Sequence, residues 1–179
     1  RRKRIENRIH HKDFYIVSLS SKNIVYKGML SSMQVREYFP DLTQPYFTSG
    51  LAVVHSRFST NTFPTWSLAQ PFRLLAHNGE INTIRGNADK MLAREETMRS
   101  EHLKGDLDKV IPVVNTEGSD SAMLDNTLEF LVMSGMELPL AVMITIPEPW
   151  DNNGTMSQKK KDFYQCYATM MEPWDGPAS

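Results

Sequence analysis

The sequence has little of what marks a secreted, membrane-bound or metal-dependent protein. It contains a single cysteine, Cys166, among 179 residues. The chain alone therefore builds neither an internal disulfide nor a cysteine-held metal site or iron–sulfur cluster. It also has no run of about eighteen apolar residues, the length that a membrane-spanning helix needs. These absences favour a reducing compartment and predict no membrane partner.

An excess of charge of one sign is also missing. Lys and Arg total 20, Asp and Glu total 21, and the formal net charge is -1. This balance gives no reason to expect nucleic acid or an anionic membrane as a partner. The one basic cluster, Arg1–Arg4, precedes Ile5 and Ile9 at helical spacing. We therefore expect the cluster on the solvated face of a helix that begins before the chain does.

The two ends of the sequence indicate a part of a longer polypeptide. The chain does not begin with Met, and Glu172–Ser179 has the composition of a turn that leads into further sequence. We expect an internal fragment that forms a single domain over residues 1–179. An apolar fraction of 40% and a charged fraction of 23% are ordinary for a globular protein of this size, which can bury a core.

Four segments carry the composition of β-strands. Asp13–Ser20 and Asn23–Met29 are rich in β-branched and aromatic residues, and the short polar link between them predicts a hairpin. Leu51–Phe58 is predicted as a buried strand that ends in a Pro- and Thr-rich loop, and Phe72–Ala76 as a further strand.

The later part of the chain has helical periodicity. A short helix is predicted over Ser31–Phe39, and a longer one begins near Ile84. Gly118–Gly135 is predicted as a helix with one leucine stripe, ended by its last glycine. Leu140–Ile146 fits a strand or a buried helix equally, and Gln158–Met171 fits an amphipathic helix. Strands followed by helices favour a layered α+β domain.

Arg57 and the Asn78–Gly79 pair are candidate binding residues. A guanidinium binds a carboxylate through two parallel hydrogen bonds, and Arg57 follows an apolar segment, so it needs a partner if that segment is buried. Asn-Gly is most often a hairpin turn. Here a helical pattern follows it, so the asparagine amide and the glycine N–H can instead point at one developing oxyanion.

Three further residues keep two interpretations each. Asp120 at a helix start either favours the helix dipole or binds an ammonium group. His77 is a possible general base, although a structural histidine fits its context better. Cys166 lies between aromatic residues in a predicted helix, where a cysteine is more often a small core residue than a nucleophile.

Several long strings of the sequence resemble one family. They are His55–Trp66, Gln70–Arg73, Ala76–Thr83, Gly118–Met123 and Met171–Pro177. In these strings the chain resembles the class II glutamine amidotransferase domains of glutamate synthases, and the likeness extends over almost its whole length. The resemblance implies an N-terminal-nucleophile hydrolase fold, an αββα sandwich with two mainly antiparallel sheets between helical layers, incomplete here at both ends.

The resemblance also implies roles for individual residues. In the family, an N-terminal cysteine attacks the side-chain amide of glutamine with its own α-amino group as base. Carried over to this sequence, Arg57 binds the α-carboxylate of L-glutamine and Asp120 its α-ammonium group. Asn78 and Gly79 form the oxyanion hole, and Thr60 is a weaker contact for the carboxylate. The nucleophile is absent, because the chain begins with Arg1, so we expect the fragment itself to be inactive.

Other parts of the family's enzymes are implied to lie outside this chain. They are a synthase domain with FMN that aminates and reduces 2-oxoglutarate, an iron–sulfur cluster, and a small reductase subunit or ferredoxin as electron donor. A bacterial cytoplasm or a plastid stroma is compatible with this expectation. Two alternatives stay open: a non-catalytic amino-acid sensor or interaction module on the same scaffold, and a thiol hydrolase that pairs Cys166 with His55 or His77.

Overall fold

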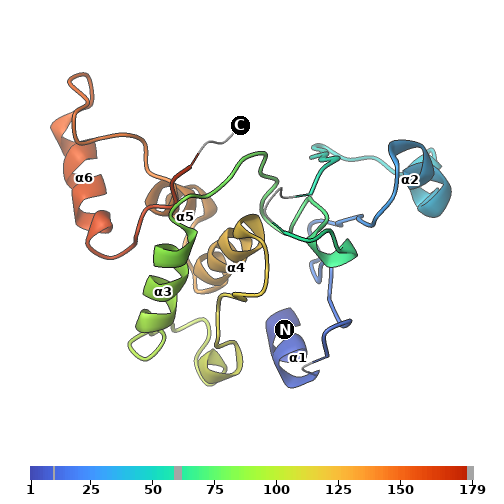
Figure 1. The fold of residues 1–179 in the computed structure, drawn as a ribbon, viewed down its shortest axis with the longest axis horizontal. Helices are drawn as coiled ribbons and strands as arrows, with labels where there is room; N and C mark the ends of the chain where they lie inside the picture. Colours follow the sequence, from blue (N-terminus) through green and yellow to red (C-terminus); the bar gives the residue numbers. More distant parts are fainter. Residues whose placement is uncertain (10, 59–61, 177–179) are drawn as a thin grey trace.

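A computed structural model describes residues 1–9, 11–58 and 62–176, and its regular structure is helical (Figure 1). The α-helices are α1 (Arg2–Ile9), α2 (Ser32–Tyr38), α3 (Ile84–Arg94), α4 (Asp120–Met133), α5 (Leu138–Thr145) and α6 (Gln158–Ala168). Short 3₁₀ helices lie at η1 (Pro40–Thr43), η2 (Trp66–Leu68) and η3 (Leu107–Lys109).

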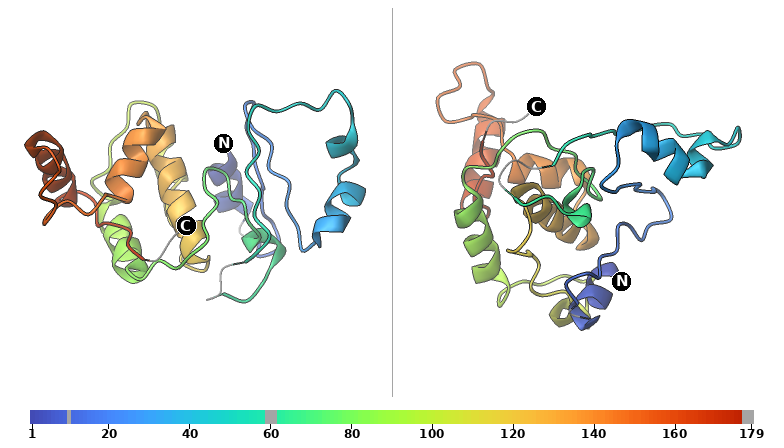
Figure 2. Two further views of the ribbon diagram at one scale, coloured as in Figure 1. Left: turned by 90° about the horizontal axis from the view of Figure 1, so that it is seen from above. Right: turned by 45° about the vertical axis from the view of Figure 1, so that its right-hand side comes forward.

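Helices α3 to α6 form the body of the molecule, and α2 lies at the opposite end from α6 in both views (Figures 1 and 2). Helix α4 packs against α3 and α5, and α5 packs against α6. The core of this body joins these helices to the segments before α3 and after α6. Its buried members are Ile81, Ala88, Met91, Val113, Val114, Leu124, Leu128, Ala141, Met171 and Trp174.

The central helix α4 is built as the sequence predicts. Ser119 caps it, because its hydroxyl accepts a hydrogen bond from the N–H of Ala122 at 3.2 Å. The predicted apolar stripe is buried at Leu124 and Leu128. Two residues after the helix, Gly135 has a φ of 103°, a left-handed conformation that favours glycine. The ring of His102 also fills the place of a Cβ there.

The other predicted helices also form, with shorter ends. Helices α2, α3 and α6 lie within the ranges that periodicity indicates. The ambiguous segment 140–146 is part of helix α5, where Pro139 lies in the first turn and therefore removes no intrahelical hydrogen bond. Ala141 and Ile144 of α5 are buried, so this is a core helix and not a strand.

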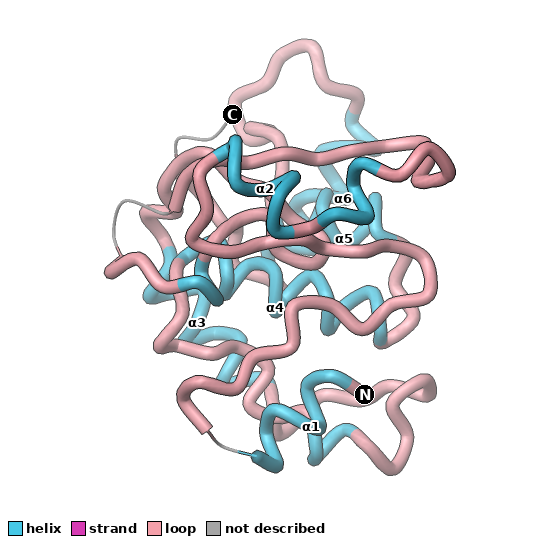
Figure 3. The backbone as a smooth tube through the Cα atoms, turned by 90° about the vertical axis from the view of Figure 1, so that its right-hand side faces the viewer, coloured by secondary structure: helices cyan, strands magenta, loops and turns pink. Residues whose placement is uncertain are grey.

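The predicted αββα sandwich is wrong for this chain, and so is the α+β class. Figure 3 has no strand, and the described residues contain no sheet, only an isolated bridge residue at Gly79. The four predicted strands, Asp13–Ser20, Asn23–Met29, Leu51–Phe58 and Phe72–Ala76, have no regular secondary structure. The predicted hairpin is therefore absent as well.

The reason lies in the missing partners of these segments. β-branched and aromatic residues favour an extended backbone, but a strand is stable only when a neighbouring strand pairs its backbone and its apolar face is covered. Among the described residues no strand pairs with any of the four segments, and Phe72 is the one side chain in them that is buried. Leu19, Ile24 and Val54 are 59%, 65% and 87% exposed, and the backbone groups of 15–29 form no hydrogen bond with other backbone groups.

Helix α1 also differs from its expected orientation. Arg2 is buried, whereas Ile5 and Ile9 are exposed. The guanidinium of Arg2 contacts the carboxylates of Glu6 and Glu129, and its Nε lies 3.1 Å from Glu129 Oε1. Arg2 therefore faces α4, because paired charges can be buried where unpaired ones cannot, whereas Arg1 and Arg4 are exposed as expected. No helix within the described ranges is long and apolar enough to cross a membrane.

Candidate functional site

Two segments that are separate in the sequence line an open groove of about 410 Å³. One is Val54–Arg57, and the other contributes Ala76 and Asn78. The volume falls within the roughly 300–1,000 Å³ of small-molecule sites. The structure thus brings two of the predicted site residues, Arg57 and Asn78, to the lining of one groove.

Arg57 reaches this groove from an exposed segment. Its backbone N–H donates to His55 Nδ1 at 3.1 Å, and its side chain is exposed. The expected buried strand before it is wrong, since Leu51 and Val54 are 78% and 87% exposed. An exposed guanidinium stays hydrated, so Arg57 is not the buried charge in need of a partner that the sequence predicted.

Gln70 and His77 close the segment that leads to Asn78 into a narrow loop. Gln70 Oε1 accepts from the N–H of His77 at 2.7 Å, and Gln70 Nε2 donates to the carbonyl of His77 at 2.7 Å. A tight turn between them is closed by the N–H of Phe72 and the carbonyl of Leu75 at 2.8 Å. Buried backbone groups need partners, and the glutamine amide supplies both partners of His77.

Polar side chains on one face of α4 bind the loop between Gln70 and His77 by hydrogen bonds. Asp125 Oδ1 accepts from the N–H groups of Arg73 and Leu74 at 3.0 and 2.8 Å. One helical turn earlier, the Ser121 hydroxyl lies 2.8 Å from His77 Nδ1. Because residues four apart share one face of a helix, Ser121 and Asp125 act as one template for the loop.

Asp120 lies next to Ser121 on α4 and is 8% exposed. Its Oδ2 accepts from the N–H of Ile81 at 2.9 Å, and its Oδ1 accepts from the N–H of Ser121 at 2.6 Å. It is in the first turn of α4, as the sequence predicts, but it is not among the residues that line the groove. The structure connects it to the Asn78–Gly79 pair through Ile81.

The C-terminal segment contacts residues 80–82, which follow the Asn78–Gly79 pair. The carbonyl of Asp175 accepts from the N–H of Asn82 at 2.8 Å. A Cβ built on Gly176 would lie 1.8 Å from the carbonyl oxygen of Glu80, so only glycine fits there. This close approach explains why a Trp-Asp-Gly string stands at 174–176, far in sequence from the groove.

Burial shifts the pKa of several ionisable groups next to this loop. Burial raises the pKa of the Asp125 carboxyl, whereas the hydrogen bond from the N–H of Leu74 and the charge of Arg73 act to lower this pKa. Burial raises the pKa of Tyr15 to about 12 and lowers the pKa of Lys27 to about 7. The Lys27 amine donates to the carbonyls of Ser67 and Ala69 at 2.8 and 2.9 Å, so it anchors the N-terminal segment to the loop.

Among the described candidate residues, Gly79, Asp120, His77 and Cys166 are not among those that line the groove. Thr60 lies outside the described residues. Cys166 is exposed on α6 and not a core residue, and it does not line the groove that contains His55. His77 is buried with its Nδ1 at Ser121, in agreement with a structural histidine. This arrangement gives no support to a thiol hydrolase built on Cys166.

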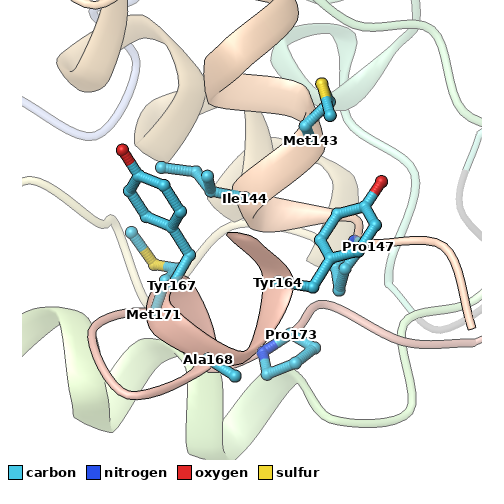
Figure 4. Close-up of a pocket in the computed structure, with 8 residues that line it drawn as sticks. All are labelled: Met143, Ile144, Pro147, Tyr164, Tyr167, Ala168, Met171 and Pro173. Atoms are coloured by element: carbon cyan, nitrogen blue, oxygen red, sulfur yellow. The ribbon is translucent and has the colours of Figure 1, made fainter. Parts of the chain in front are cut away.

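A second pocket lies between α5 and α6 (Figure 4), but its volume is only about 10 Å³. That is room for about one water molecule. The atoms that face this pocket are apolar, and they come from side chains such as Tyr164 and Met171. It is a packing gap between helices and too small for an amino acid.

The sequence reasoning missed the residues that hold the site. Gln70, Ser121 and Asp125 are buried polar residues without a predicted role. A signal was present, because Ser121, Asp125 and Glu129 repeat at a spacing of four in a helix whose apolar stripe is buried. Polar residues at that spacing in a core helix indicate a face that binds other chain segments by hydrogen bonds.

Comparison with known proteins defines the class of this chain. The family described as glutamine amidotransferases class-II matches residues 1–179. The chain belongs to this family of class II glutamine amidotransferases.

Among individual proteins, the chain is similar to glutamate synthases. It is 53% identical over 167 residues to the glutamate synthase [NADPH] large chain of Bacillus subtilis. The matched residues cover 93% of this chain and 11% of that relative. It is 54% identical over 166 residues to the glutamate synthase [NADH] of Saccharomyces cerevisiae, covering 92% and 8%. A ferredoxin-dependent glutamate synthase of Antithamnion is 48% identical over 170 residues, covering 94% and 11%. The chain thus spans about a tenth of the length of these relatives.

The residues of this chain do not fit an iron–sulfur cluster. Such clusters need several cysteine or histidine ligands, and the one cysteine lies exposed on α6. Within residues 1–9, 11–58 and 62–176 no group of three His, Cys, Asp or Glu side chains is arranged to hold a metal ion.

Proposed function

We propose that this chain is the glutamine-binding part of the glutaminase domain of a glutamate synthase, a single domain over residues 1–179. The observation that carries the proposal is the groove shared by Arg57 and Asn78. Family membership and the similarity to glutamate synthases support it. A carboxylate at one end and an amide at the other are the two features that such a groove would distinguish in free glutamine.

Each site residue has a role in this proposal. Arg57 binds the α-carboxylate of glutamine through its planar fork. Asp120 binds the α-ammonium group, since an ionised carboxylate only accepts hydrogen bonds and an ammonium only donates them. Thr60 is a further contact for the carboxylate.

Asn78 and Gly79 act on the side-chain amide of the substrate. The asparagine Nδ2–H and the glycine N–H donate to the oxygen that becomes negatively charged when a nucleophile adds to the amide carbon. The resemblance implies an attacking cysteine, and Cys166, the one cysteine among these 179 residues, does not line the groove. The 179 residues alone are therefore expected to bind glutamine without hydrolysing it.

The remaining partners of the proposed enzyme belong to other parts of it. Ammonia would pass to a synthase domain that carries FMN and aminates 2-oxoglutarate, and an iron–sulfur cluster would supply electrons. The names of the relatives specify NADPH, NADH or ferredoxin, so a reductase subunit or ferredoxin is the proposed electron donor. The proposed location is a bacterial cytoplasm or a plastid stroma.

The test uses the complete enzyme and compares glutamine with ammonia as the nitrogen source. Replacing Arg57 by alanine removes a charged hydrogen-bond pair, so the KM for glutamine should rise about tenfold to a hundredfold. Ammonia-dependent glutamate formation should not change. Arg85→Ala, at an exposed arginine of α3, is the matched control. An unchanged KM in Arg57→Ala, or an equal change in both variants, would refute the assignment.

A further inference from the structure

The loop that carries Asn78 and Gly79 is held at both ends by the first turn of α4. At one end Ser121 contacts His77, and at the other Asp120 contacts Ile81. We infer that His77, held by Ser121, is a positioning residue that aims the two oxyanion donors. This inference rests on the proposed function and adds to it a residue pair that acts through Asn78 and Gly79 and not on the substrate.

His77 is immobilised by three separate hydrogen bonds. Both of its backbone groups pair with Gln70 at 2.7 Å, and its ring nitrogen Nδ1 pairs with the Ser121 hydroxyl at 2.8 Å. The residue is 8% exposed and Ser121 is fully buried. Asn78 follows directly in the chain, so the backbone that carries its amide has a fixed starting point.

The far end of the loop is fixed just as closely. Ile81 is part of the core, and its N–H donates to Asp120 Oδ2 at 2.9 Å. The next residue, Asn82, donates to the carbonyl of Asp175. Only three residues, Asn78 to Glu80, span the two fixed points, which leaves the chain few conformations between them.

This arrangement supplies preorganised donors. Fixing a residue's backbone costs conformational entropy, and here that cost is met in folding and not in the reaction. Donors held in place stabilise a developing oxyanion without reorganising at the moment of reaction. A change that lets His77 move should therefore weaken transition-state binding and leave ground-state binding of glutamine almost unchanged.

The geometry excludes His77 as the base of the reaction. A general base must lie within hydrogen-bond reach of the proton that it removes. His77 does not line the groove, and its Nδ1 faces a buried hydroxyl. Its side chain contacts α4 while its neighbour Asn78 contacts the groove.

The test measures glutamine hydrolysis by the complete enzyme with three variants and one control. Ser121→Ala removes the hydroxyl, and His77→Ala removes the ring. His77→Asn keeps a polar atom near the place of Nδ1 and should restore part of the activity that His77→Ala loses. Thr127→Val is the control, because Thr127 is a fully buried hydroxyl on the same helix that donates only to the carbonyl of Met123.

We expect kcat to fall about tenfold to a hundredfold in Ser121→Ala and His77→Ala, since a small misplacement of catalytic groups has an effect of that order. The KM for glutamine should change less than about threefold. Thr127→Val should keep both constants. If Ser121→Ala and Thr127→Val behave alike, or if KM rises while kcat is kept, the inference is overturned and the proposed function stands.

Amide hydrogen exchange without substrate gives a second readout. The amides of residues 78–80 should exchange about tenfold faster in Ser121→Ala than in the unchanged enzyme, and Thr127→Val should not alter them. Unchanged exchange of residues 78–80 in Ser121→Ala contradicts the inference directly. If the unchanged enzyme does not hydrolyse glutamine at all, the proposed function fails, and the catalytic part of this inference fails with it.

Discussion

Residues 62–176 and residues 11–58 are held in place by different means. The first region has a core of side chains from α3, α4, α5 and the C-terminal segment. Among the described residues before Ala69, no apolar side chain is buried. The N-terminal region instead depends on a few specific contacts, such as Tyr26 against the rings of Phe39 and Phe47 at 5.0 and 6.1 Å.

The difference matters because the proposed site uses both regions. Asn78, Gly79 and Asp120 belong to the region with a core and lie on or beside α4. Arg57 belongs to the region without one. The residues that we propose to stabilise charge in the transition state therefore belong to the region with a core, whereas Arg57, which we propose to bind the substrate's carboxylate, lies on an exposed segment. Each expected outcome below breaks or sharpens this contrast.

The largest effect is expected at Asp125. It is fully buried and accepts hydrogen bonds from two backbone N–H groups and from Arg73. Asp125→Ala leaves the N–H groups of Arg73 and Leu74 without their acceptor and removes one of the two carboxylates at the Arg73 guanidinium, the other being Glu6, so the free energy of unfolding should fall by about 3–5 kcal/mol. Urea unfolding measures the change. Asp162→Ala, at an exposed acid of α6, should stay within about 0.5 kcal/mol, and equal losses in both variants would argue against the template role of α4.

The next effect is on catalysis by the complete enzyme. Asn78→Ala removes one of two donors to the developing oxyanion and should lower kcat about a hundredfold or more with little change in KM. Steady-state hydrolysis of glutamine provides both constants. A rise in KM alone would mean that Asn78 binds the ground state, and the oxyanion assignment would then be wrong.

A smaller effect is expected across the groove. Arg57→Lys keeps the charge but loses the fork that binds a carboxylate by two parallel hydrogen bonds, so the KM for glutamine should rise about tenfold with kcat almost kept. Together with Asn78→Ala this separates the two sides of the groove, one acting on kcat and the other on KM. An Arg57→Lys enzyme with an unchanged KM would show that charge alone suffices at this position.

How far the sequence predicts this structure depends on where the stabilising partners lie. Helix α4 is predictable from Ser119 to Gly135, because its cap, apolar stripe and terminating glycine are all local signals. The strands are not, because 13–29 and 51–58 have strand composition but no partner segment among the described residues. The β-propensity of these residues predicts an extended backbone, but it does not predict whether another strand is present to pair with it.

The candidate site divides along the same line. Arg57, Asn78, Gly79 and Asp120 come from strings that resemble a family, and the structure places Arg57 and Asn78 in one groove. Ser121 and Gln70, which hold the loop, were missed because their partner His77 is 44 and 7 residues away in sequence. Contacts of that kind depend on the fold and not on any local pattern.

The smallest expected effect is a pH dependence that joins the two regions. Lys27 of the N-terminal region lies 4.7 Å from the ring centroids of Tyr15 and Phe72 and donates to two carbonyls of the loop before Gln70. Burial lowers its pKa from 10.5 to about 7. In the unfolded chain the amine keeps its ordinary pKa, so between about pH 7 and 10.5 the unfolded state binds more protons than the folded state. Stability must then rise with pH across this window.

The measurement is the urea midpoint of the unchanged chain and of Lys27→Met between pH 6.5 and 9.5, since methionine keeps the apolar stem without the titrating amine. The difference between the two midpoints should move in favour of the unchanged chain as pH rises. Tyr15, whose pKa is raised to about 12, stays neutral throughout this range and does not interfere. A difference that is constant with pH would mean that Lys27 remains charged, and that solvent reaches the junction between the two regions.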